Sequence, residues 1–443
     1  MVDAPAPLAV PDSPMSDVAP VPVQGTDRIG VLDVLRGIAL LGMILVHFIE
    51  WSSDPGVGIG HAYHSFLELV LVNRFHSMFA ILFGVGFAVQ LRRAEARGDR
   101  FAARYARRLL VLALFGIIAQ GFFGFSILFG YAKWGFALLL VRNWSHRALV
   151  IALVLCAASP PLYWAGRASV DAVLGGMERV RVDPVLCAVP GVVLPSFRSS
   201  PTCKTVVERL IATRRALGSF KKSTSFRTVV AGRLRLMWQN ISSLSPIAFL
   251  PAGDFVLFLI GLLGLRLGVF ERPREHRRLI ISVTVFFAIA GLVTGFFVYP
   301  VWRLISPTAL LSLQVIVNIF ASTVLSDVYD SIAYIGAILL LVAYRPVWLR
   351  RLSAFGIAGR MALTNYMLQI IVIDLAFSNY ALALKISATY APLAALALFA
   401  VEVALSRWWL ARFRYGPLEW VWRSAAYWKL QPMRLPSPQA ATS

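Results

Sequence analysis

The stretch Arg28-Ile-Gly-Val-Leu-Asp-Val-Leu-Arg-Gly-Ile-Ala-Leu-Leu-Gly-Met-Ile-Leu-Val-His-Phe48 places an acid, a guanidinium and an imidazole inside an apolar run that is long enough to cross a bilayer. On a helix, Asp33, Arg36 and His47 lie on one face, because their spacing follows the helical repeat. Ionisable side chains in a span are costly and face protein or water rather than lipid. The stretch therefore predicts a membrane helix with a functional polar face.

Composition extends this expectation to the whole chain. Of its 443 residues, 58% are hydrophobic, and the mean hydropathy is +0.71. Apolar runs separated by short arginine-rich loops are typical of an all-α, polytopic membrane helix bundle. The formal net charge of +21 comes from basic residues beside the spans, where anionic headgroups and membrane topology account for them. The expected partner is thus the lipid bilayer and not nucleic acid.

Apolar runs predict about ten transmembrane helices. They lie near residues 30–50, 74–91, 108–128, 130–142, 147–165, 246–269, 279–300, 331–345, 361–384 and 390–409. With both termini in the cytoplasm, ten spans put the arginine clusters between and after them on the cytoplasmic side, as the positive-inside rule requires. The stretch 303–326 breaks this scheme if it crosses the membrane, so we interpret it as a re-entrant or interfacial helix.

The same pattern gives the domain organisation. Residues 1–27 are predicted to be a disordered N-terminal tail. A first helical half, 28–165, is followed by a large loop, 166–245, which the topology places outside the cytoplasm. A second helical half, 246–430, precedes a disordered tail, 431–443. Cys187 and Cys203 lie in the large loop, where an extracytoplasmic location would allow them to pair.

The first span offers different chemistry at its two ends. Arg36, with Asp33 three residues earlier, is suited to bind a phosphate or carboxylate arriving from the cytoplasm. His47 lies about 16 Å further along the helix and is suited to take a proton from a hydroxyl. Glu50 follows on the same face and can orient the imidazole. Arg74 and His76 begin the second span, which returns from the same side, so the sequence predicts an outer cluster around His47.

Structural interpretations of these residues remain open beside the chemical one. An Arg with a nearby Asp at a span end also serves as a snorkelling topology anchor, and a lone His in a bundle also serves in packing.

Asn365 and Gln369, in the ninth predicted span, either line a cofactor tunnel or bond neighbouring helices. His61 and His64 have metal-ligand spacing but lack a third ligand, so no metal is predicted.

Four motifs resemble the YeiB-like membrane family, a domain of unknown function (number 418) that is related to transmembrane acyltransferases. They are residues 28–46, 74–87, 359–369 and 414–423. The family commonly has Asn where this chain has His47, which is more similar to the related acyltransferase families. It usually has Gly-Asp-Ile-Leu where this chain has Phe125-Ser-Ile-Leu128, so an acidic residue is missing.

The resemblance implies an integral protein of the bacterial plasma (inner) membrane, active at the cell envelope. The function expected is transfer of an acyl group, such as acetyl, from cytoplasmic acyl-CoA to a hydroxyl of an extracytoplasmic sugar, envelope glycan or small molecule. His47, Glu50 and Arg74 would be catalytic, with Arg74 stabilising the developing oxyanion. Asp33, Arg36, Asn365 and Gln369 would bind the donor.

Two other classes of function are open. One is a transporter or flippase that moves a small anion or lipid-linked substrate without covalent chemistry. The other is a structural membrane component without turnover. The acceptor and the oligomeric state are left open by the sequence.

Overall fold

The computed structural model describes residues 30–52, 74–98, 101–159, 220, 223–242, 253–293 and 326–435. Over these residues the predicted all-α class is confirmed, with one isolated β-bridge between Phe413 and Arg434. The helices are α1 (Gly30–Glu50), α3 (Arg74–Glu95), α4 (Phe101–Phe123), α5 (Leu128–Val141), α10 (Phe226–Ser242), α12 (Asp254–Arg266), α13 (Arg277–Val293), α16 (Ser326–Tyr344), α17 (Val347–Arg351), α18 (Ser353–Arg360), α19 (Ala362–Phe377), α20 (Ala391–Leu410) and α21 (Pro417–Tyr427). A further helix spans His146–Ser159.

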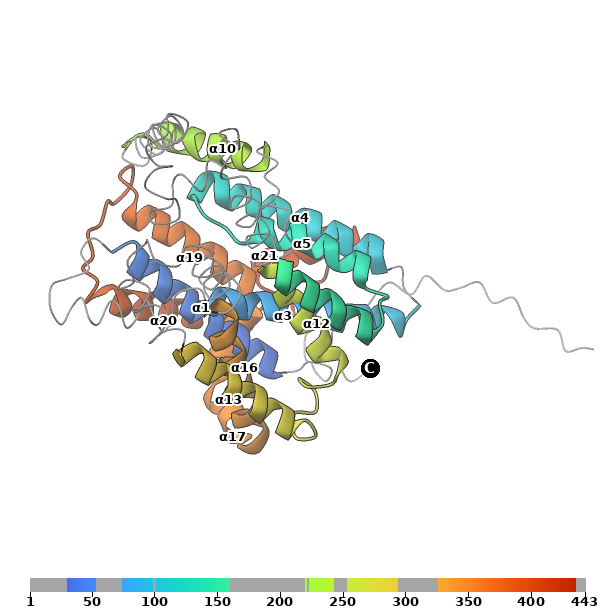
Figure 1. The fold of residues 1–443 in the computed structure, drawn as a ribbon. Coiled ribbons are helices and arrows are strands. Elements are labelled where there is room, and N and C mark those ends of the chain that lie inside the picture. The colour runs from blue at the N-terminus through green and yellow to red at the C-terminus, as the bar shows by residue number, and fades with distance from the viewer. Residues whose placement is uncertain are drawn as a thin grey trace, which may run out of the picture.

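Helix α1 is the centre of the bundle. It packs against α3, α16, α18, α19 and α20, and most of its side chains are buried, Leu35, Leu40 and Ile44 completely. Figure 1 shows α1 and α3 inside the bundle, with α4, α5 and α10 on one side and α13, α16 and α17 on the other. The polar face that the opening stretch predicts therefore faces protein along much of its length.

Glycines allow the two closest helix contacts. A Cβ at Gly37 of α1 would overlap the carbonyl oxygen of Phe355, and a Cβ at Gly359 of α18 would overlap that of Asp33. The same reciprocal arrangement joins Gly84 of α3 to Gly261 of α12. Small residues let helix backbones approach within van der Waals contact, which is how membrane helices commonly associate. The Gly359 motif therefore fixes the position of the helix that carries Asp33 and Arg36.

The prediction of about ten spans is only partly supported. Each predicted apolar run contains a helix, but among the described residues only α1, α3, α4 and α20 are long and apolar enough to cross a membrane. A fifth candidate is the pair α18 and α19, which meet at a bend of 84°. Several of the other helices are shorter within the described residues: α12 has 13, which extend about 20 Å against a hydrocarbon layer of about 30 Å.

One face of α4 is apolar and exposed. Leu110, Leu114, Ile118 and Phe122 follow one another at four-residue steps and are 38–60% exposed. A continuous apolar stripe is unusual on a water-facing helix and typical of a lipid-facing one. Exposed leucines and a valine on α20 extend the same character to a second candidate span.

Several predictions lie wholly or largely outside the described residues. These are the tail 1–27, His61 and His64, Cys187 and Cys203, and the stretch 303–326. Of the large loop 166–245, the structure describes α10 and a few residues before it. Residues 431–435, assigned from sequence to the C-terminal tail, run beside the chain at Arg414, whose N–H donates to the carbonyl of Met433 at 2.9 Å.

Candidate functional site

A cavity of about 230 Å³ lies at the C-terminal end of α1. The residues that line it are Met43, Val46, His47, Glu50, Phe75, His76 and Ile127. The structure brings together three of the four residues of the predicted outer cluster, because His47, Glu50 and His76 line one cavity although they belong to two helices. Arg74 is not among the lining residues.

His47 presents one oriented nitrogen and one unpartnered nitrogen. Its Nδ1 lies 3.5 Å from Oε2 of Glu50, one turn further along α1. Its Nε2 is buried and has no hydrogen-bond partner. The ring of Phe125 packs on the imidazole with 4.5 Å between centroids. Because Glu50 can hold a proton on Nδ1, the lone pair is left on Nε2, which is the arrangement a general base needs.

A second imidazole–carboxylate pair adjoins the first. Nε2 of His76 lies 3.3 Å from Oδ1 of Asp254, the first residue of α12. The hydroxyl of Tyr131 donates to the backbone carbonyl of His76 at 2.9 Å and helps to fix this turn of α3. Asp254 was not predicted from the sequence. Its signal was a single acid inside the predicted apolar run 246–269, and the sequence does not show that the fold brings this acid to His76.

Arg74 is engaged elsewhere. Its Nε donates to Oδ2 of Asp330 at 2.5 Å, and its backbone carbonyl accepts a bond from the hydroxyl of Ser331. Both charged side chains are largely buried, so this ion pair joins α3 to α16. The predicted role of Arg74 at a developing oxyanion remains a prediction, and the structure places its guanidinium against a carboxylate instead.

Basic side chains gather near the other end of α1. Arg36 donates to Asp33 at 3.0 Å, as their spacing predicts, and its side chain is 30% exposed. Arg108 of α4 stacks on Trp422 of α21 at 3.7 Å, while the indole N–H donates to the carbonyl of Arg108 at 2.7 Å. Arg36 and Arg423 are both close enough to Arg108 for their charges to interact. Several guanidiniums from three helices form a surface suited to phosphate.

Asn365 and Gln369 face neighbouring helices. The Asn365 amide donates to the hydroxyl of Ser406 and to the carbonyl of Ala358, each at 3.0 Å. The Gln369 amide donates to Oε2 of Glu402 at 2.9 Å. We call Asn365, Gln369, Glu402 and Ser406 the polar seam, and all four are at most 2% exposed. Of the two interpretations of this motif, helix–helix bonding describes the geometry.

Glu402 and Glu419 were not singled out from the sequence. Glu402 is an acid inside an apolar run, which was its signal. Glu419 of α21 accepts bonds from the backbone N–H groups of Leu363 and Thr364 at 2.7 and 3.2 Å, so it caps the start of α19. Burial raises the pKa of the Glu419 carboxyl, against these hydrogen bonds.

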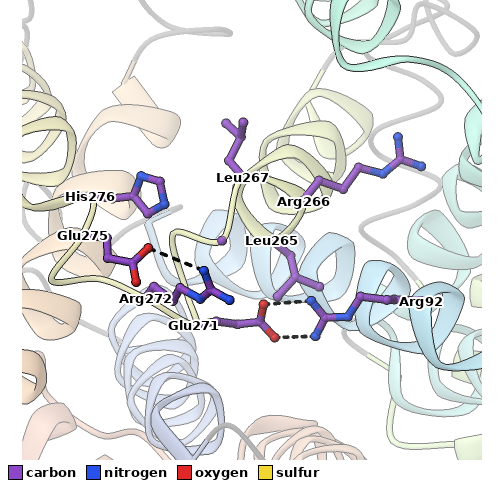
Figure 2. A pocket seen from close by; sticks show the side chains of 9 residues that line it. Arg92, Leu265, Arg266, Leu267, Glu271, Arg272, Glu275 and His276 are labelled. Carbon is purple, nitrogen blue, oxygen red and sulfur yellow. Dashed lines mark hydrogen bonds and ion pairs between the residues drawn. The ribbon is translucent and has the colours of Figure 1, made fainter. Parts of the chain in front are cut away.

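A second cavity, of about 260 Å³, lies where α12 leads into α13 (Figure 2). Its charged residues are paired with one another: Arg92 bonds Glu271 through two nitrogens, and Arg272 lies 3.7 Å from Glu275. Arg266 points away, with its guanidinium on the carbonyls of Arg142 and Trp144. The carboxylates satisfy the guanidiniums, so this cavity is a weaker candidate than the one at His47. Among the described residues, no three His, Cys, Asp or Glu side chains form a metal site.

Two families match different parts of the chain. Residues 28–169 match the family described as heparan-alpha-glucosaminide N-acetyltransferase, catalytic. Residues 265–429 match the family described as protein of unknown function (DUF418). The resemblance to the YeiB-like family and to membrane acyltransferases is thereby confirmed. The His47 cavity and Arg36 belong to the first matched region, whereas the polar seam and Glu419 belong to the second.

Two relatives are similar over nearly their whole lengths. The uncharacterized protein YxaH of Bacillus subtilis (strain 168) is 28% identical over 438 residues, covering 93% of this chain and 97% of its own. An uncharacterized 39.9 kDa protein from the amylase 3′ region of Bacillus acidopullulyticus is 27% identical over 423 residues, covering 94% and 98%. No solved structure matches the chain.

Proposed function

We propose that this chain is a membrane acyltransferase that moves an acyl group, such as acetyl, from acyl-CoA to a sugar. The observation that carries the proposal is the unpartnered Nε2 of His47, on a ring that lines a cavity and is paired with Glu50 through its other nitrogen. This constellation lies inside the region that matches an N-acetyltransferase catalytic family. The glucosaminide in that family's description supports a sugar acceptor, either an envelope glycan hydroxyl or an amino-sugar nitrogen.

The proposed step uses His47 as the general base. Nε2 takes the proton of the acceptor O–H or N–H while the acceptor atom bonds to the thioester carbonyl carbon. Collapse of the tetrahedral intermediate breaks the carbon–sulfur bond, and the thiolate leaves and receives the proton. Glu50 stabilises the imidazolium that forms in between, as a carboxylate on the far nitrogen does in other acyl-transfer sites.

The arginines at the other end of α1 support an anionic donor. Arg36 and Arg108 are held by Asp33 and by Trp422, so their positive charges are fixed in position before a ligand binds. The rise of the helix separates Arg36 from His47 by about 16 Å. An acyl-CoA with its phosphates at Arg36 must extend its thiol arm along α1 to reach His47. Arg36 does not line the His47 cavity, so this path has to open during turnover.

We place the protein in the bacterial plasma membrane with both termini in the cytoplasm. The lipid-facing stripe on α4 and the apolar length of α1, α3 and α20 support the membrane location. In this orientation Arg36 faces the compartment that contains acyl-CoA, and His47 faces the envelope.

The test is transfer of label in sealed vesicles that contain the purified full-length chain. Acyl-CoA labelled in its acyl group is supplied on the Arg36 side, and amino sugars or glycan fragments are supplied on the His47 side. We expect label to appear covalently on the acceptor, and His47→Ala to abolish this. His146→Ala, at an exposed histidine on another helix, is the matched control.

Two outcomes contradict the proposal. Equal transfer by wild type and His47→Ala removes the assigned base. Passage of unmodified solute without consumption of acyl-CoA assigns the chain to the transporter class.

A further inference from the structure

Arg233 of α10 joins three segments of the bundle. It bonds both carboxylate oxygens of Asp374, with Nη2 2.5 Å from Oδ1 and Nη1 3.2 Å from Oδ2. Its Nη1 also donates to the carbonyl of Phe122 at the end of α4. The Asp374 side chain is fully buried and that of Arg233 is 10% exposed. Breaking a bidentate, largely buried pair of this kind is costly, because it would leave a buried charge without its partner.

Asp374 is itself fixed by its own helix end. The hydroxyl of Ser378 donates to Oδ1 at 2.6 Å, and the hydroxyl of Tyr380 donates to Oδ2. The ring of Tyr380 also lies 5.1 Å from that of Phe226, at the start of α10. The Asp374 carboxylate is therefore held in place, and α10 is anchored at two points along its length.

Arg233 contacts the last residues of α4 and the short connection that leads to α5. We call residues 122–127 together the 122–127 link. Gly124 in this link has φ +91°, and the position of its missing Cβ is 2.9 Å from Nε of Arg233. A larger residue there would be strained and would displace the guanidinium. The far end of the link is fixed to α19, because the N–H of Ile127 donates to the hydroxyl of Tyr366 at 3.0 Å.

The 122–127 link covers His47. Phe125 packs on the imidazole, and its ring is also 6.2 Å from that of Trp51. Ile127 lines the His47 cavity directly. The chain of contacts thus runs from Asp374 through Arg233 to the link, and from the link to the imidazole and its cavity.

We propose that Arg233 and Asp374 are positioning residues for His47: their ion pair holds the 122–127 link so that Phe125 covers the imidazole, and its release admits the acceptor. Arg233 belongs to a part of the large loop, so this assigns a task to a segment that lies far from the first span in sequence. The inference rests on the proposed function of His47, but the structural arrangement can be tested without turnover.

The test measures how fast diethyl pyrocarbonate modifies His47 in the purified full-length protein, followed by mass spectrometry of the labelled peptide. Arg233→Gln should increase the rate by about tenfold or more, because charge-assisted hydrogen bonds no longer oppose opening of the link. Phe125→Ala should increase it as well, since the cover itself is removed. Arg235→Gln, an exposed arginine on the same helix, should leave the rate unchanged. His146 is exposed and serves as the internal reference in every sample.

An unchanged rate at His47 in a folded Arg233→Gln protein overturns the proposal. If that variant does not fold, Arg233→Lys decides the matter: Lys keeps the charge but cannot form two parallel hydrogen bonds, so the rate must still exceed that of wild type. In the transfer reaction the same variants should change KM for the acceptor and not for acyl-CoA. If His47→Ala retains full transfer while Arg233→Gln still increases the rate at which His47 is modified, the proposed function is wrong. The inference that the ion pair holds Phe125 over His47 is then still supported.

Discussion

The His47 end of α1 and the polar seam between α19 and α20 contain similar side chains in opposite surroundings. Both combine an acid with a nitrogen-bearing group inside an apolar helix, and both contain buried atoms without a hydrogen-bond partner. At His47 the unpartnered atom is a nitrogen on a ring that lines a cavity. In the polar seam the unpartnered atoms are Oε1 of Gln369 and Oε1 of Glu402, on two groups that already bond each other.

The two regions differ in what could satisfy the unpartnered atoms, because in the polar seam a single proton is enough. A neutral Glu402 would carry a hydrogen that it can donate to Oε1 of Gln369, so a single proton satisfies both acceptors. A neutral acid is also the less costly form in an apolar bundle. Nε2 of His47 has no partner of this kind, and in the proposed function the acceptor that enters the cavity would supply one. An unpartnered polar atom on a residue that lines a cavity therefore favours His47 as the candidate functional site.

The largest expected effect tests the His47 side of this comparison. His47→Asn keeps a polar side chain but supplies no base, so transfer should fall by about 10²–10⁴-fold while the unfolding temperature changes little. Gln369→Met should do the reverse, lowering the unfolding temperature with a small effect on kcat. Transfer kinetics and thermal unfolding of the same preparations check both. If Gln369→Met removes activity without loss of stability, the two regions are not distinct.

The next effect tests whether the seam holds a proton. Glu402→Ala leaves the Gln369 amide without its partner and opens a cavity, which should lower the free energy of unfolding by about 2–4 kcal/mol. Glu402→Gln should remain within about 1 kcal/mol of wild type, because its amide N–H replaces the acid O–H as donor to Oε1 of Gln369. Thermal unfolding in detergent compares the three proteins. Equal destabilisation by both substitutions would mean that Glu402 is ionised in the folded protein.

The sequence predicted what local spacing controls. The position of α1, the contact of Asp33 with Arg36, and the meeting of His47 with Glu50 follow from the helical repeat. That His76 joins them follows from the return of the next helix. The all-α class followed from composition, and bonding between neighbouring helices was one of two interpretations of Asn365 and Gln369, with the partner residues unknown.

The partners that are far apart in sequence were not predictable. Asp330 lies 256 residues from Arg74, and Asp374 lies 141 residues from Arg233. One sequence shows that each residue is charged, but not which other charge the fold brings to it. The number of spans is only partly supported for a related reason, since an apolar run does not show where a helix ends, as at Leu267 after α12.

A smaller effect ranks the two imidazoles of the cavity. Nε2 of His76 already lies 3.3 Å from Asp254, whereas Nε2 of His47 is unpartnered. We therefore expect His76→Asn to lower transfer by only about tenfold, or ~1.4 kcal/mol of barrier, against the larger loss at His47. The ratio of kcat/KM values for the two variants measures this. A larger loss at His76 would make it the base and reverse the assignment.

The smallest effect comes from the exposed counterpart of the seam, the ion pair of Arg92 with Glu271 (Figure 2). The hydrogen bond from Arg92 holds the pKa of Glu271 below its ordinary value. A lowered pKa in the folded state means that the pair stabilises fully above about pH 5 and that this contribution is lost as the pH falls below about 4. Because Arg92 is more than half exposed, the contribution is at most about 1 kcal/mol and is screened by salt. The unfolding temperatures of wild type and Glu271→Gln should therefore differ slightly at pH 7 in low salt and converge in acid.

The difference in unfolding temperature between wild type and Glu402→Gln should be insensitive to salt, since water and ions do not reach the seam. A salt dependence there would place Glu402 in contact with solvent.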